Sequence, residues 1–305
     1  MTFLSLVVAL LLEQWRPLRS GNVVFVWFTR YINAVAHNLN AGRYRDGAVA
    51  WLLIVAPVAL IAGLGYVLLR HINPLAALAW NVGVLYLALG FRQFSHFFSD
   101  ILQALQRGDL PKAREFVALW RGRSAQELQG GEVARVSIEL GLVASHRHVF
   151  GVMMWFAAFG AAGAIAYRIA AMLNDRWSER DEEKQGSFGE FAARAFTIMD
   201  WVPVRLTALA FAVAGDFMGA VECWREQAQH WRPPAHGIVL AAAAGALGVK
   251  LGGELHEYGT LEYRPELGAG DEADTDYMQA AVGLMWRALV LWVFLIALTT
   301  IASWF

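Results

Sequence analysis

The chain has 305 residues, of which 57% are hydrophobic and only 17% charged, and its formal net charge is −1. A soluble domain would carry about a quarter charged residues, so this composition indicates a membrane protein, and the near-zero net charge argues against nucleic acid as a partner. Cys223 is the only cysteine, which excludes an internal disulfide and redox chemistry by a thiol pair.

Several apolar runs are long enough to cross a bilayer, which requires roughly 20 residues. Residues 1–15 lack a basic leader and a small-residue cleavage site, so a short first membrane segment is expected rather than a signal peptide. Uncharged runs follow at residues 48–69, 72–91, 149–167 and 288–305. The sequence therefore predicts an all-α, polytopic integral membrane helical bundle over residues 1–305, with lipid as its surroundings.

The two cleanest runs, 48–69 and 72–91, are separated only by Arg70 and His71, so they must form a tight hairpin. Arginine and lysine are frequent beyond both outer ends, and such residues favour the cytoplasmic side. Residues 92–148 are therefore expected to form a cytoplasmic, mostly helical insert, and the protein is expected to span the bacterial inner membrane several times.

Within this insert, Asp109 is placed to cap a helix that has Pro111 in its first turn. The stretch "SAQE" at 124–127 has the form of a capping box. The helix "GGEVARVSIEL" follows, and its charged residues Glu132, Arg135 and Glu139 recur at i, i+3 and i+7, so we expect them on one face.

The stretch 174–190 carries many charges of both signs and reads as a solvated loop, on the outer side if residues 149–167 cross once. Residues 197–215 and 236–251 are short or polar for full spans. Both are expected to be broken or re-entrant helices, which a membrane accepts where they are buried in protein.

Residues 198–209 place Asp200, Pro203 and Arg205 in an apolar run. Because proline has no N–H, a helix is expected to end near Trp201 and restart at Pro203, leaving free N–H groups that with Arg205 would bind an anion. The alternative is structural: Asp200 caps the helix and Arg205 extends to the lipid headgroups.

Four blocks of sequence carry a family resemblance, in the order "ALQRGDLPKAR", "GEVARVSIEL", "FGEFAARAFTIMDWVPVRLTAL" and "GVKLGGELHEYGTLEYRPELGAG". They resemble the CobD/CbiB family of membrane proteins over about residues 91–289. The resemblance implies adenosylcobinamide-phosphate synthase activity in cobalamin biosynthesis, in which an aminopropanol group or its phosphate is joined by an amide bond to adenosylcobyric acid. It also implies a corrinoid substrate, with Mg²⁺ and ATP as co-reactants.

The resemblance and the charges together predict the site. The expected catalytic residues are Glu139, Arg205 and Glu266. The expected substrate-binding residues are Asp200, Lys250, Tyr258 and Arg264. Secondary candidates for a metal are Glu132, His146 and His148.

The chain departs from the family where "LGLVASHRHVFGV" and "AAMLNDRWSERDEEKQ" replace acidic motifs expected to bind metal. Its short N-terminus and the run "DWVPVRL" instead resemble AmpE, a relative associated with sensing in β-lactamase induction. The alternative function is therefore a non-enzymatic membrane sensor or regulator, and a homo-oligomer is compatible with either reading.

Overall fold

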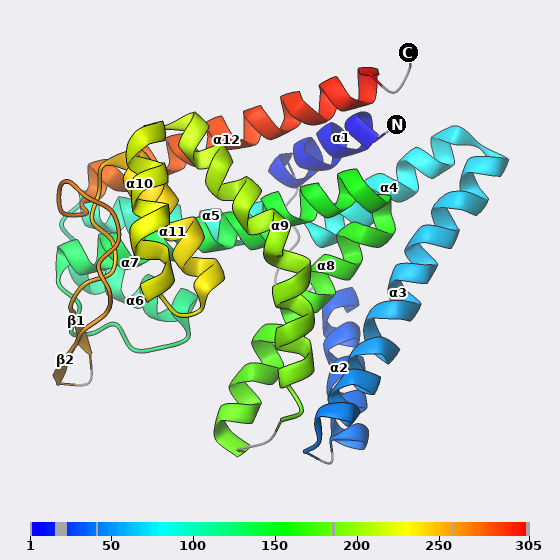
Figure 1. The fold of residues 1–305 in the computed structure, drawn as a ribbon, viewed down its shortest axis with the longest axis horizontal. Helices are drawn as coiled ribbons and strands as arrows, with labels where there is room; N and C mark the ends of the chain where they lie inside the picture. Colours follow the sequence, from blue (N-terminus) through cyan, green and yellow to red (C-terminus); the bar gives the residue numbers. More distant parts are fainter. Residues whose placement is uncertain (1, 16–22, 41, 185–186, 258, 303–305) are drawn as a thin grey trace. The chain divides into compact units, whose positions relative to one another are not determined.

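The computed structural model describes residues 2–15, 23–40, 42–184, 187–257 and 259–302. These residues are almost entirely helical, which confirms the all-α prediction (Figure 1). They fold as two compact units, one built from Met1–Gly90, Arg147–Trp201 and Ile296–Phe305, the other from Phe91–His146 and Val202–Leu295.

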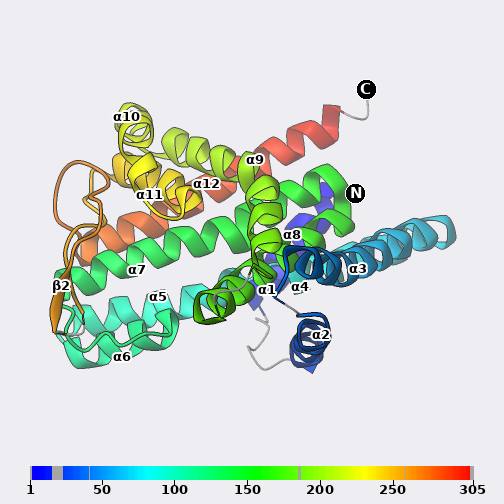
Figure 2. The same cartoon turned by 60° about the horizontal axis from the view of Figure 1, so that its bottom comes forward.

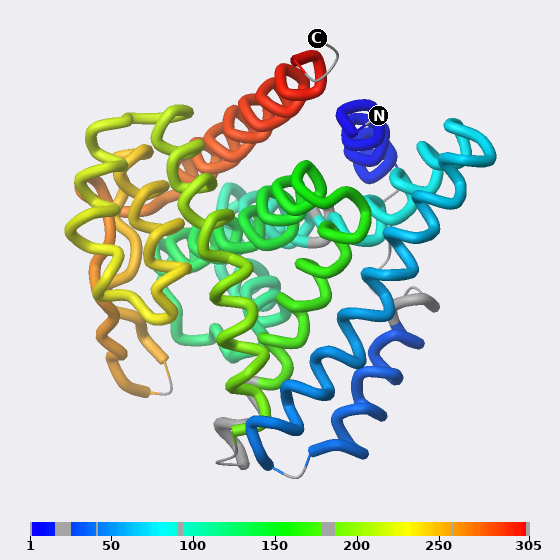
Figure 3. The backbone as a smooth tube through the Cα atoms, turned by 45° about the vertical axis from the view of Figure 1, so that its right-hand side comes forward, coloured from blue at the N-terminus to red at the C-terminus, as the bar shows by residue number. Residues whose placement is uncertain are grey.

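The first unit contains the predicted hairpin. Its helices are α1 (Thr2–Trp15), α2 (Val23–Leu39), α3 (Tyr44–Ile72), α4 (Pro74–Ala88), α8 (Gly151–Lys184) and the first half of α9 (Glu190–Ala214). Helices α3 and α4 meet at Asn73, whose side chain accepts the Leu75 N–H and caps α4. Figure 3 shows α2 beside α3, and this contact contributes Ile32 and Ile54 to a buried apolar cluster.

Helix α8 differs most from its prediction. Gly160, at φ 62° and ψ −151°, interrupts it, and this conformation is accessible essentially only to glycine. Gly151 lies so close to the Tyr167 ring that a Cβ there would come within 2.3 Å of it. The chain therefore folds back at Gly160, so the apolar run at residues 149–167 does not form one straight helix.

The second half of α8 also extends further than expected. The charged stretch predicted as a loop from residue 174 stays helical as far as Lys184. Trp177 is 1% exposed and packs against Phe188, so an apolar contact anchors this part of the helix in spite of its charges. The loop prediction is therefore wrong for residues 174–184.

Helix α9 runs without interruption from Glu190 to Ala214, with Pro203 inside it. The predicted end at Trp201 and restart at Pro203 are wrong. Pro203 cannot donate to the Met199 carbonyl four residues earlier, but the Trp155 indole N–H donates to that oxygen at 3.1 Å. Because a neighbouring helix supplies the missing donor, the helix continues through the proline.

The second unit contains the predicted insert helices, which form over most of residues 92–148. Its elements are α5 (Phe91–Gln106), α6 (Leu110–Arg121), α7 (Gly130–Ser145), a π-helical turn at His146–Phe150 that continues past the unit's edge, the second half of α9, α10 (Phe217–Gln227), a 3₁₀ turn at Ala228–His230, α11 (Pro234–Leu247), β1 (Leu255–Glu257), β2 (Thr260–Glu262) and most of α12 (Thr275–Ala302). The cytoplasmic location of the insert stays a prediction.

Of the two predicted helix starts in the insert, one is confirmed. Asp109 caps α6 by accepting the Lys112 N–H at 3.1 Å. Residues 124–127 form no helix, so the capping box at "SAQE" is wrong; the Glu127 carboxylate instead accepts the Gly259 N–H. The capping box lies one turn later, where the Gln129 N–H donates to Glu132 at the start of α7.

Helix α11, part of the region expected to be re-entrant, is a short and almost fully buried helix. It packs closely on α10, because Gly245 lies against the Gly219 carbonyl, where a Cβ would come within 2.2 Å. Small residues let two helix backbones approach in this way. Both helices contact the loop that follows α11, since Gln227 at the end of α10 accepts the Gly268 N–H and Gly268 lies close to Ala244 of α11.

Within the described residues, four helical stretches are long and apolar enough to span a bilayer by length and composition: Tyr44–Ile72, Gly130–Trp177, Glu190–Ala214 and Thr275–Ala302. The second of these, Gly130–Trp177, joins α7 to α8 and includes the reversal at Gly160. Only 17% of the apolar window in α3 is buried. Its exposed leucines and isoleucines would be unfavourable in water, so they indicate contact with lipid. The structure thus supports a helical membrane protein.

Candidate functional site

The candidate site lies in the second unit, where the segment 248–274 folds over the polar face of α7. Glu132 and Glu139 are on this face, as their spacing predicted, and both are buried. Figure 2 shows the β1–β2 hairpin of this segment at the end of α7 where that helix begins. Residues far apart in the sequence therefore meet in one polar cluster.

Backbone pairing fixes the shape of the segment. Leu251 and Leu267 exchange two N–H···O bonds of 2.8 and 2.9 Å. Gly252 follows with φ 72°, and a Cβ at this position would lie 2.0 Å from the Pro265 carbonyl. A glycine is required here by both the left-handed backbone and the close approach.

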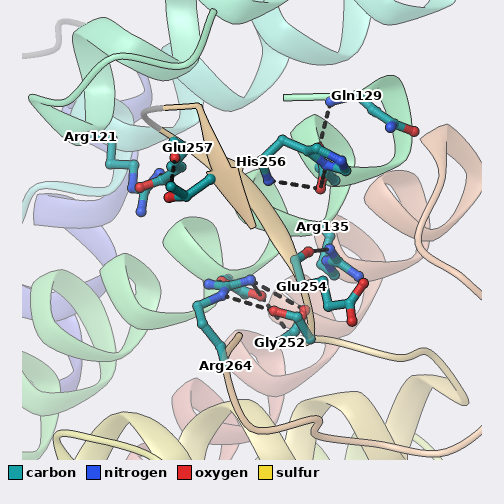
Figure 4. Close-up of polar contacts among 12 residues, drawn as sticks. Arg121, Gln129, Arg135, Gly252, Glu254, His256, Glu257 and Arg264 are labelled. Atoms are coloured by element: carbon teal, nitrogen blue, oxygen red, sulfur yellow. Dashed lines mark hydrogen bonds and ion pairs between the residues drawn. The ribbon is translucent and has the colours of Figure 1, made fainter. Parts of the chain in front are cut away.

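Glu139 and Arg264 form the central contact. The Arg264 guanidinium donates to both oxygens of Glu139, at 2.7 and 3.1 Å, and the Gly252 N–H donates to the same carboxylate at 2.8 Å (Figure 4). Arg264 also lies over the Trp231 ring, 5.4 Å from its centroid. This bidentate pair ties the segment to α7 and leaves little of either group for a ligand.

Further contacts fasten the hairpin to the helices. His256 donates its backbone N–H to Glu132 at 3.2 Å, and its Nδ1 lies 2.8 Å from the same oxygen. Glu257, which is buried, pairs with Arg121 of α6 (Figure 4). The hairpin is therefore held by charge-assisted bonds to two helices.

The open side of the cluster carries the groups that remain available. Lys250 is 44% exposed and pairs with Glu272 at 3.5 Å. Arg135 donates to the Glu254 carbonyl and lies 3.9 Å from the same Glu272 carboxylate (Figure 4 shows Arg135 and Glu254). Glu266 is exposed, and no hydrogen bond or ion pair holds it within the described chain.

The structure thus brings together the predicted residues Glu139, Lys250, Arg264 and Glu266, and the secondary candidate Glu132. Tyr258 lies outside the described residues.

The other predicted residues are elsewhere. Asp200 is buried in the first unit and accepts the Tyr167 hydroxyl at 2.7 Å, so it does not cap a restarted helix. Arg205 is half-buried on α9, and the bonds that join α7 to the segment 248–274 do not include it. His146 is buried with its Nδ1 2.9 Å from the Thr207 hydroxyl, while His148 belongs to the other unit.

The described residues do not fit a dedicated metal site, since no three His, Cys, Asp or Glu side chains gather among them. Glu132 and Glu139 already accept N–H donors on both oxygens. Mg²⁺ commonly binds through substrate phosphates and few protein ligands. The open side of the site carries cations, Lys250 and Arg135, which suit phosphate groups.

Sequence reasoning missed Trp231, His256 and Glu272. His256 and Glu272 lie in or beside the glycine-rich block that had been recognised, so their proximity could have drawn attention to them. Trp231 is distant from that block in sequence, and only the fold brings its ring to Arg264.

These features define a class: a helical membrane protein with a charged site formed by one helix and a glycine-rich segment. The CobD/Cbib protein family model matches residues 6–285. The chain is similar to the cobalamin biosynthesis protein CobD of Stutzerimonas stutzeri, with 37% identity covering 95% of each chain. A CobD from Chromobacterium violaceum is also 37% identical, over 95% of this chain and 94% of its own.

A third relative, the CobD of Mycobacterium tuberculosis, is 30% identical over 82% of this chain and 81% of its own. No solved structure matches the chain. The chain belongs to the CobD/CbiB family.

Proposed function

We propose that this protein is an adenosylcobinamide-phosphate synthase of cobalamin biosynthesis. It would join aminopropanol, or its phosphate, to a carboxyl side chain of adenosylcobyric acid. The observation that carries this proposal is the family match across residues 6–285, together with CobD relatives that align over nearly the whole chain. These comparisons do not favour the AmpE-like sensor.

The chemistry is the formation of an amide from a carboxylate and an amine. The carboxylate oxygen first attacks a phosphorus atom of ATP, giving an acyl phosphate and ADP, or an acyl adenylate and pyrophosphate. The neutral amine then attacks the acyl carbon, so that the C–N bond forms and the C–O bond to phosphate or AMP breaks. The amine must lose a proton, which requires a base.

Among the assembled residues, Glu266 fits the base. Its carboxylate is exposed, whereas Glu139 is engaged by Arg264 and the Gly252 N–H. We therefore assign Glu139 and Arg264 to positioning the segment 248–274 rather than to the bond-making step. The free N–H groups that argued for an anion site at Arg205 do not exist in the continuous helix.

The apolar helices and the distribution of arginine support a proposal for the location. We propose a multi-pass protein of the bacterial inner membrane whose α7 site opens to the cytoplasm, where nucleotide is available. The abundance of arginine in residues 92–148 supports this orientation. A homo-oligomer stays a prediction.

Complementation tests the function. In a strain that lacks its own synthase and receives cobyric acid as its corrinoid source, expression of this protein should restore cobalamin-dependent growth. The protein level in the membrane must be measured in parallel. If the protein is well expressed and inserted in the membrane but does not restore growth, the proposed enzymatic function is wrong.

The role of Glu266 has its own test, made with membranes that form the amide. Glu266→Gln should lower the rate about 100-fold, and the defect should shrink as the pH approaches the pKa of the substrate amine, where the amine needs no base. Glu262→Gln, an exposed change on β2, is the control. A pH-independent defect would assign Glu266 to something other than proton removal.

A further inference from the structure

Two cations from different elements share one carboxylate at the open side of the site. Arg135 comes from α7, and Lys250 from the segment that follows α11. The Glu272 carboxylate lies 3.5 Å from the Lys250 nitrogen and 3.9 Å from an Arg135 nitrogen. A phosphoryl group is also an anion that accepts hydrogen bonds from arginine and lysine, so it could occupy the same position between these two cations.

Arg135 is held in place by one hydrogen bond, and other N–H groups of its guanidinium are not used by that bond. One terminal nitrogen donates to the Glu254 carbonyl, and its side chain is only 13% exposed. Its Nε is buried with no hydrogen-bond partner among the described residues. Its other terminal nitrogen faces Gly253, where a Cβ would come to 3.4 Å, so the absent side chain leaves space beside the guanidinium.

Glu272, by contrast, is weakly held. Its side chain is 73% exposed, and its distance from Arg135 is longer than a hydrogen bond. Exposed ion pairs of this kind contribute little to stability, because water screens them. A phosphate brings up to two negative charges and three strong acceptor oxygens, so it competes well for the same two cations.

We infer that Arg135 and Lys250 form a phosphoryl-binding site, and that Glu272 is an internal counter-ion which the incoming phosphate displaces. The inference rests on the proposed function only for the source of the phosphate, which is either an amino-alcohol phosphate or a nucleotide. Glu266 helps to distinguish the two sources, because it also lies beside Gly253. A Cβ added to Gly253 would come within 3.7 Å of the Glu266 Cγ. A carboxylate there would pair with the ammonium group of an amino-alcohol phosphate.

The test is direct binding to the full-length protein in nanodiscs of zwitterionic lipid, at low ionic strength. The probes are 2-aminoethyl phosphate and a non-hydrolysable ATP analogue, measured by calorimetry without corrinoid. Lys250→Met should weaken binding about tenfold, since a charged hydrogen bond to phosphate is lost. Glu272→Gln should tighten binding several-fold, because the competing carboxylate is gone.

The chain offers a matched control pair in α6. Lys112 and Glu115 are 47% and 57% exposed and form an ion pair at 2.8 Å, and Glu115 raises the pKa of Lys112, chiefly through their hydrogen bond. Lys112→Met and Glu115→Gln should leave both affinities unchanged. Glu266→Gln should weaken only the aminoethyl phosphate if that compound is the natural type of ligand.

The outcomes separate the inference from the proposed function. Binding of neither probe to the natural protein, unchanged binding by Lys250→Met, or unchanged or weaker binding by Glu272→Gln would each overturn the inference. Lys250→Arg, which keeps the charge, should bind, and this shows that the Met variant fails through lost charge rather than misfolding. Failed complementation with intact phosphate binding would remove the synthase proposal and leave the site standing.

Discussion

At the scale of single residues, the contact between Glu139 and Arg264 decides the form of the site. Both side chains are largely removed from water, which is costly for charged groups. Two hydrogen bonds between them, the Gly252 N–H and the Trp231 ring offset this cost. Removing one partner would leave the other charge buried without compensation.

Glu139→Gln is therefore expected to lower the free energy of unfolding by about 3 kcal/mol, because Arg264 loses its counter-charge. Thermal unfolding of the detergent-purified protein measures this change. Arg264→Lys should also destabilise, since a lysine cannot make the bidentate contact or lie flat on Trp231. Full stability in both variants would show that this ion pair is dispensable for folding.

At the scale of elements, two helices differ from what their sequences suggest, and in opposite ways. Helix α9 contains a proline and stays continuous, while α8 contains no proline and reverses at Gly160. In a straight helix, residues 155 and 167 would be about 18 Å apart along the axis. Instead the Trp155 and Tyr167 rings lie 6.4 Å apart, so the two halves of α8 pack on each other.

The same tryptophan links the two helices, and this gives a prediction for α9. Trp155→Phe keeps an aromatic ring but removes the donor to the Met199 carbonyl, so it should cost about 1–2 kcal/mol of stability. In the double variant with Pro203→Ala, the new alanine N–H can donate to that carbonyl, and the cost should largely disappear. Thermal unfolding of the two single variants and the double variant measures the coupling.

If the effects of Trp155→Phe and Pro203→Ala were simply additive, the indole would not be replacing the missing amide. Trp80→Phe is a suitable comparison, because the Trp80 indole donates to the Ala62 carbonyl of α3 at 2.9 Å. The residue four positions after Ala62 is Tyr66, so no proline removes the helical donor to that oxygen. Its cost should be unaffected by Pro203→Ala.

At the scale of the whole molecule, the exposed apolar surfaces of the long helices define the surroundings. Helix α3 is largely unburied although it is the most hydrophobic candidate span. Arginine before α3, and arginine and lysine after α4, predict that the tip of the hairpin faces outward. The tip at Arg70 and His71 and the α6 end at Arg123 should then lie on opposite sides of the membrane.

Cysteine labelling of spheroplasts tests this orientation. Cys223 is buried, and burial raises the pKa of its thiol, so it should react slowly, and Cys223→Ser provides a clean background. In that background, His71→Cys should react with a membrane-impermeant maleimide from outside. Arg123→Cys should react only after the membrane is opened, and equal labelling of both positions would contradict the predicted topology.

The sequence by itself determined the class of the protein and much of its site. Hydrophobic runs of bilayer length predicted the membrane helices, and the spacing of Glu132, Arg135 and Glu139 predicted their shared face, because both follow from local geometry. The glycine-rich block around Lys250 and Arg264 was recognisable as a unit. These properties require no knowledge of distant neighbours.

Tertiary structure decided which partner each of these groups contacts. Glu139 was expected to act in catalysis, but Arg264, 125 residues later, engages its carboxylate. Pro203 was expected to break a helix, but an indole from α8 supplies the missing donor. A proline or glycine in the sequence determines only which backbone hydrogen bonds and conformations are possible, and a buried charge requires only that some partner be present. The identity of the partner depends on packing between segments that are far apart in the chain.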